Sequence, residues 1–499
     1  MGTQDGPSRD RVKLVASTGD VAGYPTPSKS SSSGTGDDDD EYGSAKSNDD
    51  VLSYFESAQW TADGTTLLTY SSTNLISGYI VPEDLLSSED ELTLRPQAHV
   101  QLPEPSNVLS GAPYFSLAEP WTQQLLVSAR DHPLQLFYLA PSSSSTSASA
   151  RAPVSSYPFT KARSETFLTA TSLLWPSPGT HFIAGSRSLL ARFDVQRTGE
   201  EPVTRIRTIP SERHLSKGGG VGMRGTVSAL GGQSMDTGTG ASLVAAGTWT
   251  RWVGLYDFGQ AGECVATWSI AAAVRETAMD ERLNGGRHSS QNESPNGIGG
   301  DGITQTTWSP CGRYLVICER KSHGALVYDV RVTGKLLGYL TGRDALGNQR
   351  VACDVFPGTD AQGGFEVWSG TSSGTVKVWE SVGSVEGSHA PAWEWAAHSS
   401  TVGSTCLHPS GTVVATCAGS WEFPNENDDP AHAVSPGGSD KSHGSGSEGD
   451  SDDGSDDGSD NGSGSETNSS GCRLPWMQRR NKESSLRIWS VTGFPSGSK

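Results

Sequence analysis

The sequence predicts an all-β fold, a β-propeller of about seven blades, and two observations lead to this prediction. Residues 351–356, 365–369 and 376–379 are short apolar or alternating runs separated by turn residues, which is the pattern of antiparallel strands. The chain then repeats this unit along most of its length. A repeated antiparallel sheet unit is the sequence signature of a propeller.

The repeated units share an apolar strand, a turn, a second strand and then a third strand that ends in an aromatic residue, in several units followed by Asp. In four of them a turn of the Pro-x-Gly or Asp-Gly kind follows the first strand. In chain order the units run from Trp60 to Tyr79, Leu125 to Tyr138, Leu174 to Asp194, Leu243 to Asp257, Trp308 to Asp329, Gly347 to Trp379, and Leu407 to Trp489. Insertions stretch their spacing beyond the ~40 to 45 residues usual for a WD repeat.

Ring closure follows from the physics of the repeat. Each four-stranded sheet buries its two faces only against neighbouring sheets, so the array has to close on itself. We expect residues 51–55 to supply the outer strand of the last blade. We also expect His398 to hydrogen-bond inside a blade, because it resembles the histidine that begins many WD repeats.

Composition divides the 499 residues into one large domain and loose segments. We expect a disordered, acidic and Ser-rich tail over residues 1–50, a propeller over residues 51–492, and a disordered acidic insertion over residues 422–482 within the last blade. The net charge is -19, but residues 1–50 carry -5 and residues 422–466 carry -12, so the rest of the chain is nearly neutral. A nearly neutral ring can still present a basic face.

Enzyme signatures are weak. Gly220, Gly222 and Gly225 match a dinucleotide-binding pattern, but a polar loop precedes them and a strand, not a helix, is expected after them. No other nucleophile, phosphate-loop or zinc-protease motif is present, so we expect no enzyme activity and no cofactor.

The seven cysteines include no C-x-x-C pair, so we expect no metal site and mostly buried, reduced thiols. There is no apolar run long enough to span a membrane and no N-terminal apolar signal segment, so we expect no membrane partner.

Several residues then point to a family. They lie at the start of the first unit, in the fourth unit, around the sixth unit and in the seventh: Phe55, Trp60, Gly64 and Thr69; Ala246, Gly247, Gly254 and Tyr256; Gly342 and Arg343; Asn348, Gln349, Arg350, Asp354 and Pro357; Ser369 to Trp379; and Phe423 with Pro424. In these positions the chain resembles a fungal member of the telomerase Cajal body protein family, WD-repeat proteins that bind small Cajal-body RNAs.

The resemblance implies a non-catalytic RNA-binding factor in nuclear small-RNA and telomerase RNP biogenesis. Its partners would be a small nuclear or Cajal-body RNA of the box H/ACA type, the proteins of that RNP and a chaperonin for folding. Its location would be the nucleus, in nuclear bodies, and the cytoplasm is a second location that the resemblance allows. The alternative is a nuclear protein–protein scaffold linked to pre-mRNA splicing.

Candidate RNA-binding residues combine aromatic rings that can stack on unpaired bases with arginines that can meet phosphate. One cluster is Trp249, Arg251 and Trp252, and a second is Asn348, Gln349 and Arg350, whose amides could read base edges. Arg343 is a further candidate, and Arg320 and Lys321 add to a basic face. Packing between blades is an equally good interpretation of the two tryptophans, and a loop hydrogen-bond network is the alternative for Gln349 and Arg350.

Overall fold

The computed structural model describes residues 11–21, 53–139, 152–209, 222–233, 243–284, 297–358, 364–422 and 480–492. The chain divides into two compact units, of which the first comprises residues 1–420 and 481–499 and contains the ring described below. The second unit, residues 421–480, includes β30 (Trp421–Glu422), which pairs with β31 (Arg480–Asn481). The predicted acidic insertion otherwise lies outside the described residues.

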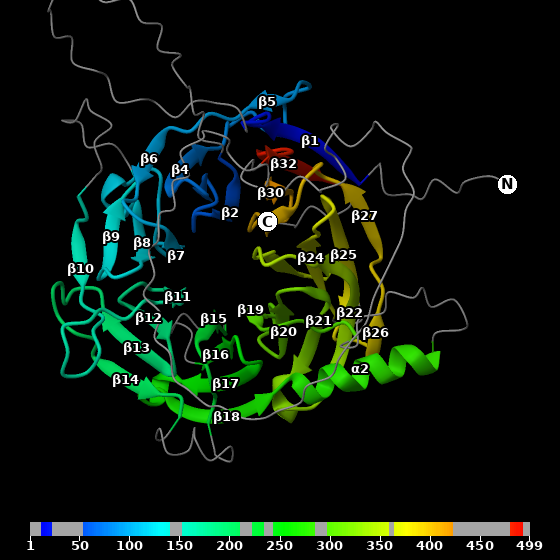
Figure 1. Ribbon diagram of the computed structural model, residues 1–499. Coiled ribbons are helices and arrows are strands. Elements are labelled where there is room, and N and C mark those ends of the chain that lie inside the picture. The colour runs from blue at the N-terminus through cyan, green and yellow to red at the C-terminus, as the bar shows by residue number, and fades with distance from the viewer. Residues whose placement is uncertain are drawn as a thin grey trace, which may run out of the picture. The chain divides into compact units, whose positions relative to one another are not determined.

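Seven antiparallel sheets, the blades, are arranged around a central axis (Figure 1), and this confirms the predicted seven-bladed propeller. From the innermost strand outward, blade 1 is β2 (Phe55–Trp60), β3 (Thr66–Ser71), β4 (Leu75–Ile80) and β6 (Ala98–Gln101); blade 2 is β7 (Ser106–Gly111), β8 (Gln124–Ala129), β9 (Leu134–Tyr138) and β10 (Ser155–Tyr157); blade 3 is β11 (Ser172–Leu174), β12 (His181–Ser186), β13 (Leu189–Asp194) and β14 (Thr204–Arg207).

The remaining blades follow the same order. Blade 4 is β15 (Val227–Gly232), β16 (Leu243–Thr248), β17 (Trp252–Asp257) and β18 (Glu263–Ser269); blade 5 is β19 (Ile303–Trp308), β20 (Tyr314–Glu319), β21 (Ser322–Asp329) and β22 (Leu336–Ala345); blade 6 is β23 (Cys353–Pro357), β24 (Phe365–Gly370), β25 (Thr375–Val382) and β27 (Trp393–Ala396); blade 7 is β28 (Val402–Leu407), β29 (Val413–Ala418), β32 (Ser485–Val491) and β1 (Val12–Ser17).

Blades 5 and 7 have a short fifth strand on the outside. β26 (Gly387–His389) pairs with β22, and β5 (Leu92–Thr93) pairs with β1, both in parallel. Short 3-10 helices η1 (Pro120–Thr122), η2 (Phe258–Gln260) and η3 (Val330–Val332) occupy turns, and the helix α2 (Ala271–Asn284) lies between blades 4 and 5 in the chain.

The outer strand of the last blade corrects one prediction. Residues 51–55 do not supply it, because Phe55 begins β2, the innermost strand of blade 1. The strand is β1, which pairs antiparallel with β32 and lies inside residues 1–50, where we expected disorder throughout. The six residues of β1 were not recognised as a strand in the sequence because the segment around them is rich in polar residues. Arg11 holds the start of β1 against blade 6 through an ion pair with Glu380 at 2.9 Å.

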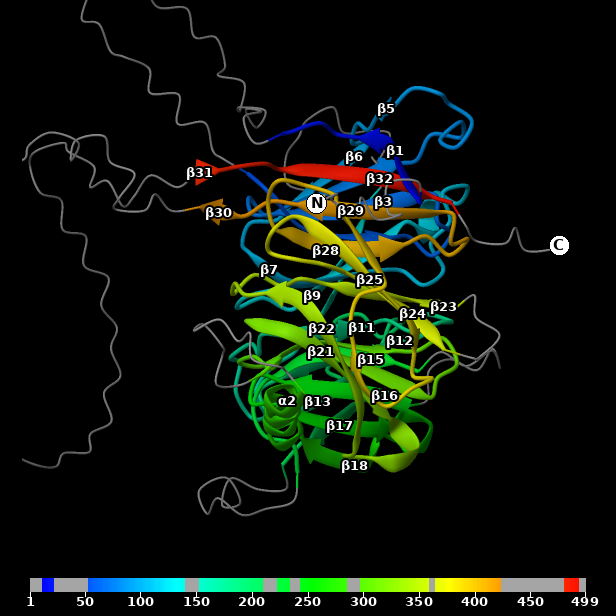
Figure 2. The same cartoon turned by 90° about the vertical axis from the view of Figure 1, so that its right-hand side faces the viewer.

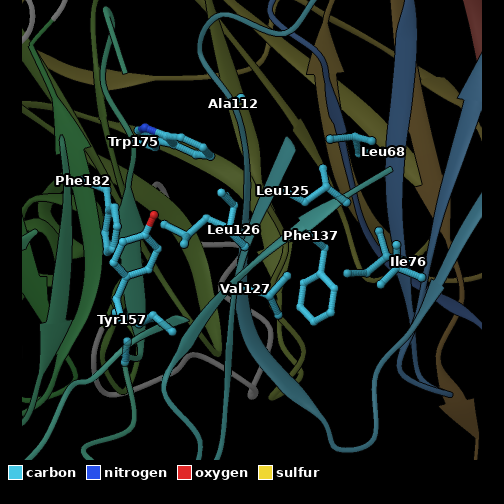
Figure 3. Packing of buried hydrophobic residues seen from close by; sticks show 14 of the residues in the cluster. Leu68, Ile76, Ala112, Leu125, Leu126, Val127, Phe137, Tyr157, Trp175 and Phe182 are labelled. Atoms are coloured by element: carbon cyan, nitrogen blue, oxygen red, sulfur yellow. The ribbon is translucent and has the colours of Figure 1, made fainter. Parts of the chain in front are cut away.

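The core lies between the blades, as the ring requires. Figure 3 shows Leu125, Leu126 and Phe137 of blade 2 packed between residues of blades 1 and 3, and all of these side chains are buried. Near the axis, hydroxyls and amides of the innermost strands bind the next blade. For example, Gln305 donates to Cys353 O at 2.7 Å and accepts from Cys353 N at 2.8 Å.

His398 is structural, as predicted. Its Nδ1 lies 2.9 Å from Glu483 Oε1 and its Nε2 lies 2.8 Å from Thr416 Oγ1, and Trp489 Nε1 donates to the same hydroxyl at 2.9 Å. Burial lowers the pKa of His398 and so favours the neutral imidazole; with its proton on Nδ1, Trp489 donates to Thr416, Thr416 to His398, and His398 to Glu483. The chain of bonds ties the loop before blade 7 to strands β29 and β32.

Strand direction defines two ends of the ring. In the side view of Figure 2 the strands run roughly along the ring axis. The loops before the innermost strands and the loops between the second and third strands of each blade therefore open on the same end, which we call the loop face. Hydrogen bonds between the two sets of loops, such as Trp249 N to Thr226 O and Asp301 N to Arg320 O, confirm that they lie together.

Candidate nucleic-acid interface

Trp249 presents an aromatic surface on the loop face. It lies in the turn between β16 and β17, and it is 41% exposed, although tryptophan side chains are on average largely buried. The guanidinium of Arg320, from the β20–β21 turn of the next blade, lies 5.9 Å from the Trp249 ring centre. Neighbouring Lys321 is exposed and its Nζ lies 3.4 Å from Asp301. An exposed ring and two cations thus come together from blades 4 and 5.

Arg251 has a different role from the one its sequence position suggests. Its Nε lies 2.7 Å from Oε1 of Glu319, a residue of β20 whose side chain is only 2% exposed. The other carboxylate oxygen of Glu319 accepts a hydrogen bond from Gly300 N at 3.1 Å. Arg251 therefore joins blades 4 and 5 as the partner of a buried charge, and it positions the turn that carries Trp249.

Trp252 also packs inward. It is the first residue of β17, is half-buried, and contacts the apolar cluster between blades 3 and 4 that contains Met223 and Tyr256. Of the predicted cluster Trp249, Arg251 and Trp252, only Trp249 offers its ring to solvent. Packing between blades therefore describes Trp252, whereas Trp249 contacts Arg320 of the next blade and still keeps 41% of its surface exposed.

Arg343 must be removed from the candidate interface. Its side chain is 1% exposed, and its guanidinium donates to Ser369 Oγ at 3.2 Å, Ser322 Oγ at 3.0 Å, and the carbonyl oxygens of Glu319 and Val351. These bonds join β22 of blade 5 to blade 6. A guanidinium whose donors are satisfied inside the protein cannot contact a ligand, so the role of Arg343 is structural.

The second predicted cluster lies in the loop before β23. Asn348 is exposed, and Gln349 donates from Nε2 to Gly419 O of blade 7 at 2.8 Å. Arg350 donates to Thr171 O at 3.3 Å. Because Thr171 precedes the innermost strand of blade 3 and Arg350 that of blade 6, the Arg350 side chain reaches across the loop-face end of the ring opening.

Arg350 is both solvent-exposed and surrounded by protein, as its position across the ring opening explains. The surrounding protein lowers the pKa of its guanidinium, and the nearby Glu56 carboxylate partly offsets that effect. Burial raises the pKa of Glu56, while the charge of Arg350 lowers it. The pattern of residues gave no signal for Glu56, because only ring closure brings β2 close to the loop before β23.

Other predicted features are placed as follows. Of the three glycines, Gly220 lies outside the described residues, and Gly222 and Gly225 lead into β15, a strand and not the helix that a dinucleotide-binding turn needs. Cys318, Cys353 and Cys417 are buried thiols as expected, but Cys264 and Cys311 are exposed. Within the described ranges, no group of three or more His, Cys, Asp or Glu side chains is placed to hold a metal ion. The helices of the same ranges are too short or too polar to cross a membrane.

The seven-bladed ring and the His398 network define a WD-repeat β-propeller. No family model matches the chain. It is 24% identical to telomerase Cajal body protein 1 of Bos taurus over 376 residues, which cover 74% of this chain and 59% of the bovine protein. The chain thus spans less than two thirds of that relative.

Two fungal proteins are similar to a comparable degree. Guanine nucleotide-binding protein negative regulator 1 of Schizosaccharomyces pombe is 24% identical over 69% of this chain and 75% of its own length. Protein SWT21 of Vanderwaltozyma polyspora is 24% identical over 68% of this chain and 70% of its own length. The similarity to telomerase Cajal body protein 1, found also in the human, mouse and rat proteins, supports this chain as a distant member of that family.

Proposed function

We propose that this protein is a non-catalytic RNA-binding WD-repeat factor of nuclear small-RNA or telomerase RNP biogenesis. Support comes from its similarity to telomerase Cajal body protein 1 and from the chemistry of the loop face. Its partners would be a small RNA of the box H/ACA type and the proteins of that RNP, with a chaperonin assisting the slow closure of the ring. Its location would be nuclear bodies.

The exposed Trp249 ring with Arg320 beside it carries the proposal. Proteins bind single-stranded RNA by stacking bases on aromatic rings and by meeting the phosphates with cations. Trp249 is available for stacking because neighbouring side chains leave it 41% exposed. Arg320 makes no ion pair in the part of the chain that the structure describes, so its charge is available to a phosphate. The net charge of -19 does not oppose this, since most of it lies in residues 1–50 and 422–466.

The test combines crosslinking in the native cells with binding in solution. The tagged protein is crosslinked to RNA and the recovered RNA is sequenced, using the wild type, Trp249→Ala and Trp121→Ala. Trp121 is the matched control, because it is 64% exposed but lies in η1, between the first and second strands of blade 2, at the opposite end of the ring. We expect box H/ACA guide RNAs or telomerase RNA with the wild type and with Trp121→Ala, and loss with Trp249→Ala.

In solution, removing one stacking ring costs about 1–3 kcal/mol, so Trp249→Ala should weaken binding of the recovered RNA about 5- to 150-fold. Affinity should also fall steeply with salt. Equal losses in both tryptophan variants, or no RNA above background, would refute the proposal.

A protein–protein scaffold, including one linked to splicing, is the second candidate, and Trp121 favours it. A tryptophan that is 64% exposed on the end opposite the loop face is typical of a protein contact. Under this alternative, Trp121→Ala would remove co-purifying proteins while Trp249→Ala would not.

A further inference from the structure

The loop-face end of the ring opening brings together a carboxylate and a guanidinium. Glu56 lies in β2 of blade 1, and Arg350 precedes β23 of blade 6. Gly403 of β28 lies between them: a Cβ added there would fall 2.6 Å from Glu56 O and 3.4 Å from Gln349 Nε2. Glycine at 403 thus permits the close approach of the Glu56 and Gln349–Arg350 segments.

Both charged groups have unused hydrogen-bonding capacity. The half-buried Glu56 carboxylate makes no hydrogen bond or ion pair with any residue that the structure describes. Arg350 makes one hydrogen bond, to Thr171 O, although a guanidinium has five N–H donors. No ion pair within 4 Å joins Glu56 to Arg350. Polar groups in a partly desolvated place are normally satisfied, so this arrangement suits a ligand that brings both donors and acceptors.

We propose that Glu56 and Arg350 bind a guanine base of single-stranded RNA at the loop-face end of the ring opening. Guanine presents the N1–H and N2–H₂ donors side by side on its Watson–Crick edge, where a carboxylate can accept two hydrogen bonds. Its O6 and N7 are acceptors that an arginine meets in a bidentate manner. Adenine has no N1–H, and its exocyclic amine stands where guanine carries O6. Of the two bases, only guanine satisfies both side chains at once.

This inference rests on the proposed function and adds base specificity to it. Trp249 and Arg320 stack and neutralise charge without regard to sequence, whereas Glu56 and Arg350 select one base. The two sites are on the same face, in the loops of blades 4 and 5 and at the ring opening. A chain of unpaired nucleotides could therefore contact both.

The experiment measures binding of short labelled RNAs by fluorescence anisotropy. The probes are octamers of uridine with one central position occupied by guanine, inosine, 7-deazaguanine or adenine. A good bidentate contact discriminates by about 1–3 kcal/mol, so we expect guanine to bind about 5- to 150-fold more tightly than adenine. The affinities of the inosine probe, which lacks the N2 amine, and of the 7-deazaguanine probe, which lacks N7, should lie between those of the guanine and adenine probes.

Variants assign each contact. Glu56→Gln should abolish the difference between guanine and inosine, and Arg350→Lys should reduce the difference between guanine and 7-deazaguanine. Trp249→Ala should weaken all four probes by the same factor. Unchanged thermal unfolding of each variant establishes that the effect is on binding.

The outcomes separate the two proposals. If no RNA binds at all, the proposed function fails. If RNA binds but wild type and Glu56→Gln show the same ratio of guanine to adenine affinity, the guanine site alone is refuted. Guanosine monophosphate competes as a separate arm. If it binds as tightly as the guanine octamer, the site belongs to a free nucleotide and the assignment to RNA is overturned.

Discussion

Replacement of Arg251 by alanine should destabilise the ring, although the residue lies on the loop face. The change leaves the Glu319 carboxylate, 2% exposed, with the backbone N–H of Gly300 as its remaining partner. Removing one member of a buried ion pair costs about 3–5 kcal/mol, because the remaining charge is desolvated without compensation. Because the Arg251 side chain is 19% exposed and the pair is therefore not fully desolvated, we expect the lower end of that range, about 3 kcal/mol.

Arg320→Ala is the matched control for this measurement. It removes an arginine from the adjacent turn on the same face, but one that makes a cation–π contact with Trp249 at 5.9 Å and no ion pair with a described residue. Such a contact contributes about 0.5–1 kcal/mol at an exposed site. Denaturant unfolding followed by fluorescence should therefore separate the two variants by about 2 kcal/mol.

A double-mutant cycle gives the decisive result. In Arg251→Ala with Glu319→Ala no charge is left buried alone, so the double variant should be more stable than the sum of the single effects predicts. Additive effects, or an Arg251→Ala loss no larger than that of Arg320→Ala, would refute the description of Arg251 as the partner of a buried charge. If the description holds, loss of RNA binding in Arg251→Ala cannot be assigned to a direct contact.

Three further predictions concern stability. Burial lowers the pKa of His398. The pKa of Glu483 is also lowered: burial alone would raise it, but the hydrogen bonds that the carboxylate accepts from His398, Ser399 and Ser485 outweigh that effect. In both cases the unfolded chain binds more protons than the folded one, so stability should fall as the pH drops below about 6.5, where His398 is protonated on unfolding, and again below about 4.5, where Glu483 is. Unfolding midpoints measured over a pH series test this, and Glu483→Gln should flatten the second fall. Deletion of residues 1–20 exposes the edge of β32 and should cause aggregation or a large loss of thermal stability, whereas deletion of residues 1–10 should leave the unfolding midpoint unchanged. Arg343→Met should lower the free energy of unfolding by several kcal/mol and make unfolding less cooperative than Arg320→Met does, because it leaves buried hydrogen-bond acceptors in two blades without a donor.

The repeat and the ring were predictable from the sequence because their cause is local. Each unit carries its own strand pattern and turn, as in Trp308 to Asp329, and each observed blade contains one predicted unit. His398 was predictable for the same reason, since its position before an apolar strand is part of the repeat. The outer strand of blade 7 was not, because β1 is separated in the chain from β32 and its six residues stand alone in a polar segment.

The candidate site was predictable only as a set of residue types. Arg251, Arg343 and Arg350 all lie near turns, and nothing in their immediate sequence separates them. Their roles depend on groups from other blades: Glu319 lies beside Arg251, the acceptors of Arg343 are shared between blades 5 and 6, and Arg350 faces the ring opening. Long-range closure decides these contacts, and a local pattern does not contain it.

The arginines of the loop face therefore fall into two kinds with different consequences for binding. Arg251 and Arg343 donate to groups of neighbouring blades, and so fix the loops that carry Trp249 and Arg350. A fixed loop loses less conformational entropy when a ligand binds, so these residues contribute to affinity without touching the ligand. Arg320 and Arg350 keep donors accessible and can contribute directly. Substitutions of the first kind should lower stability and binding together, whereas those of the second kind should lower binding with an effect of at most about 1 kcal/mol on stability. The joint measurement, applied to each arginine, therefore identifies the contact surface even before the RNA is known.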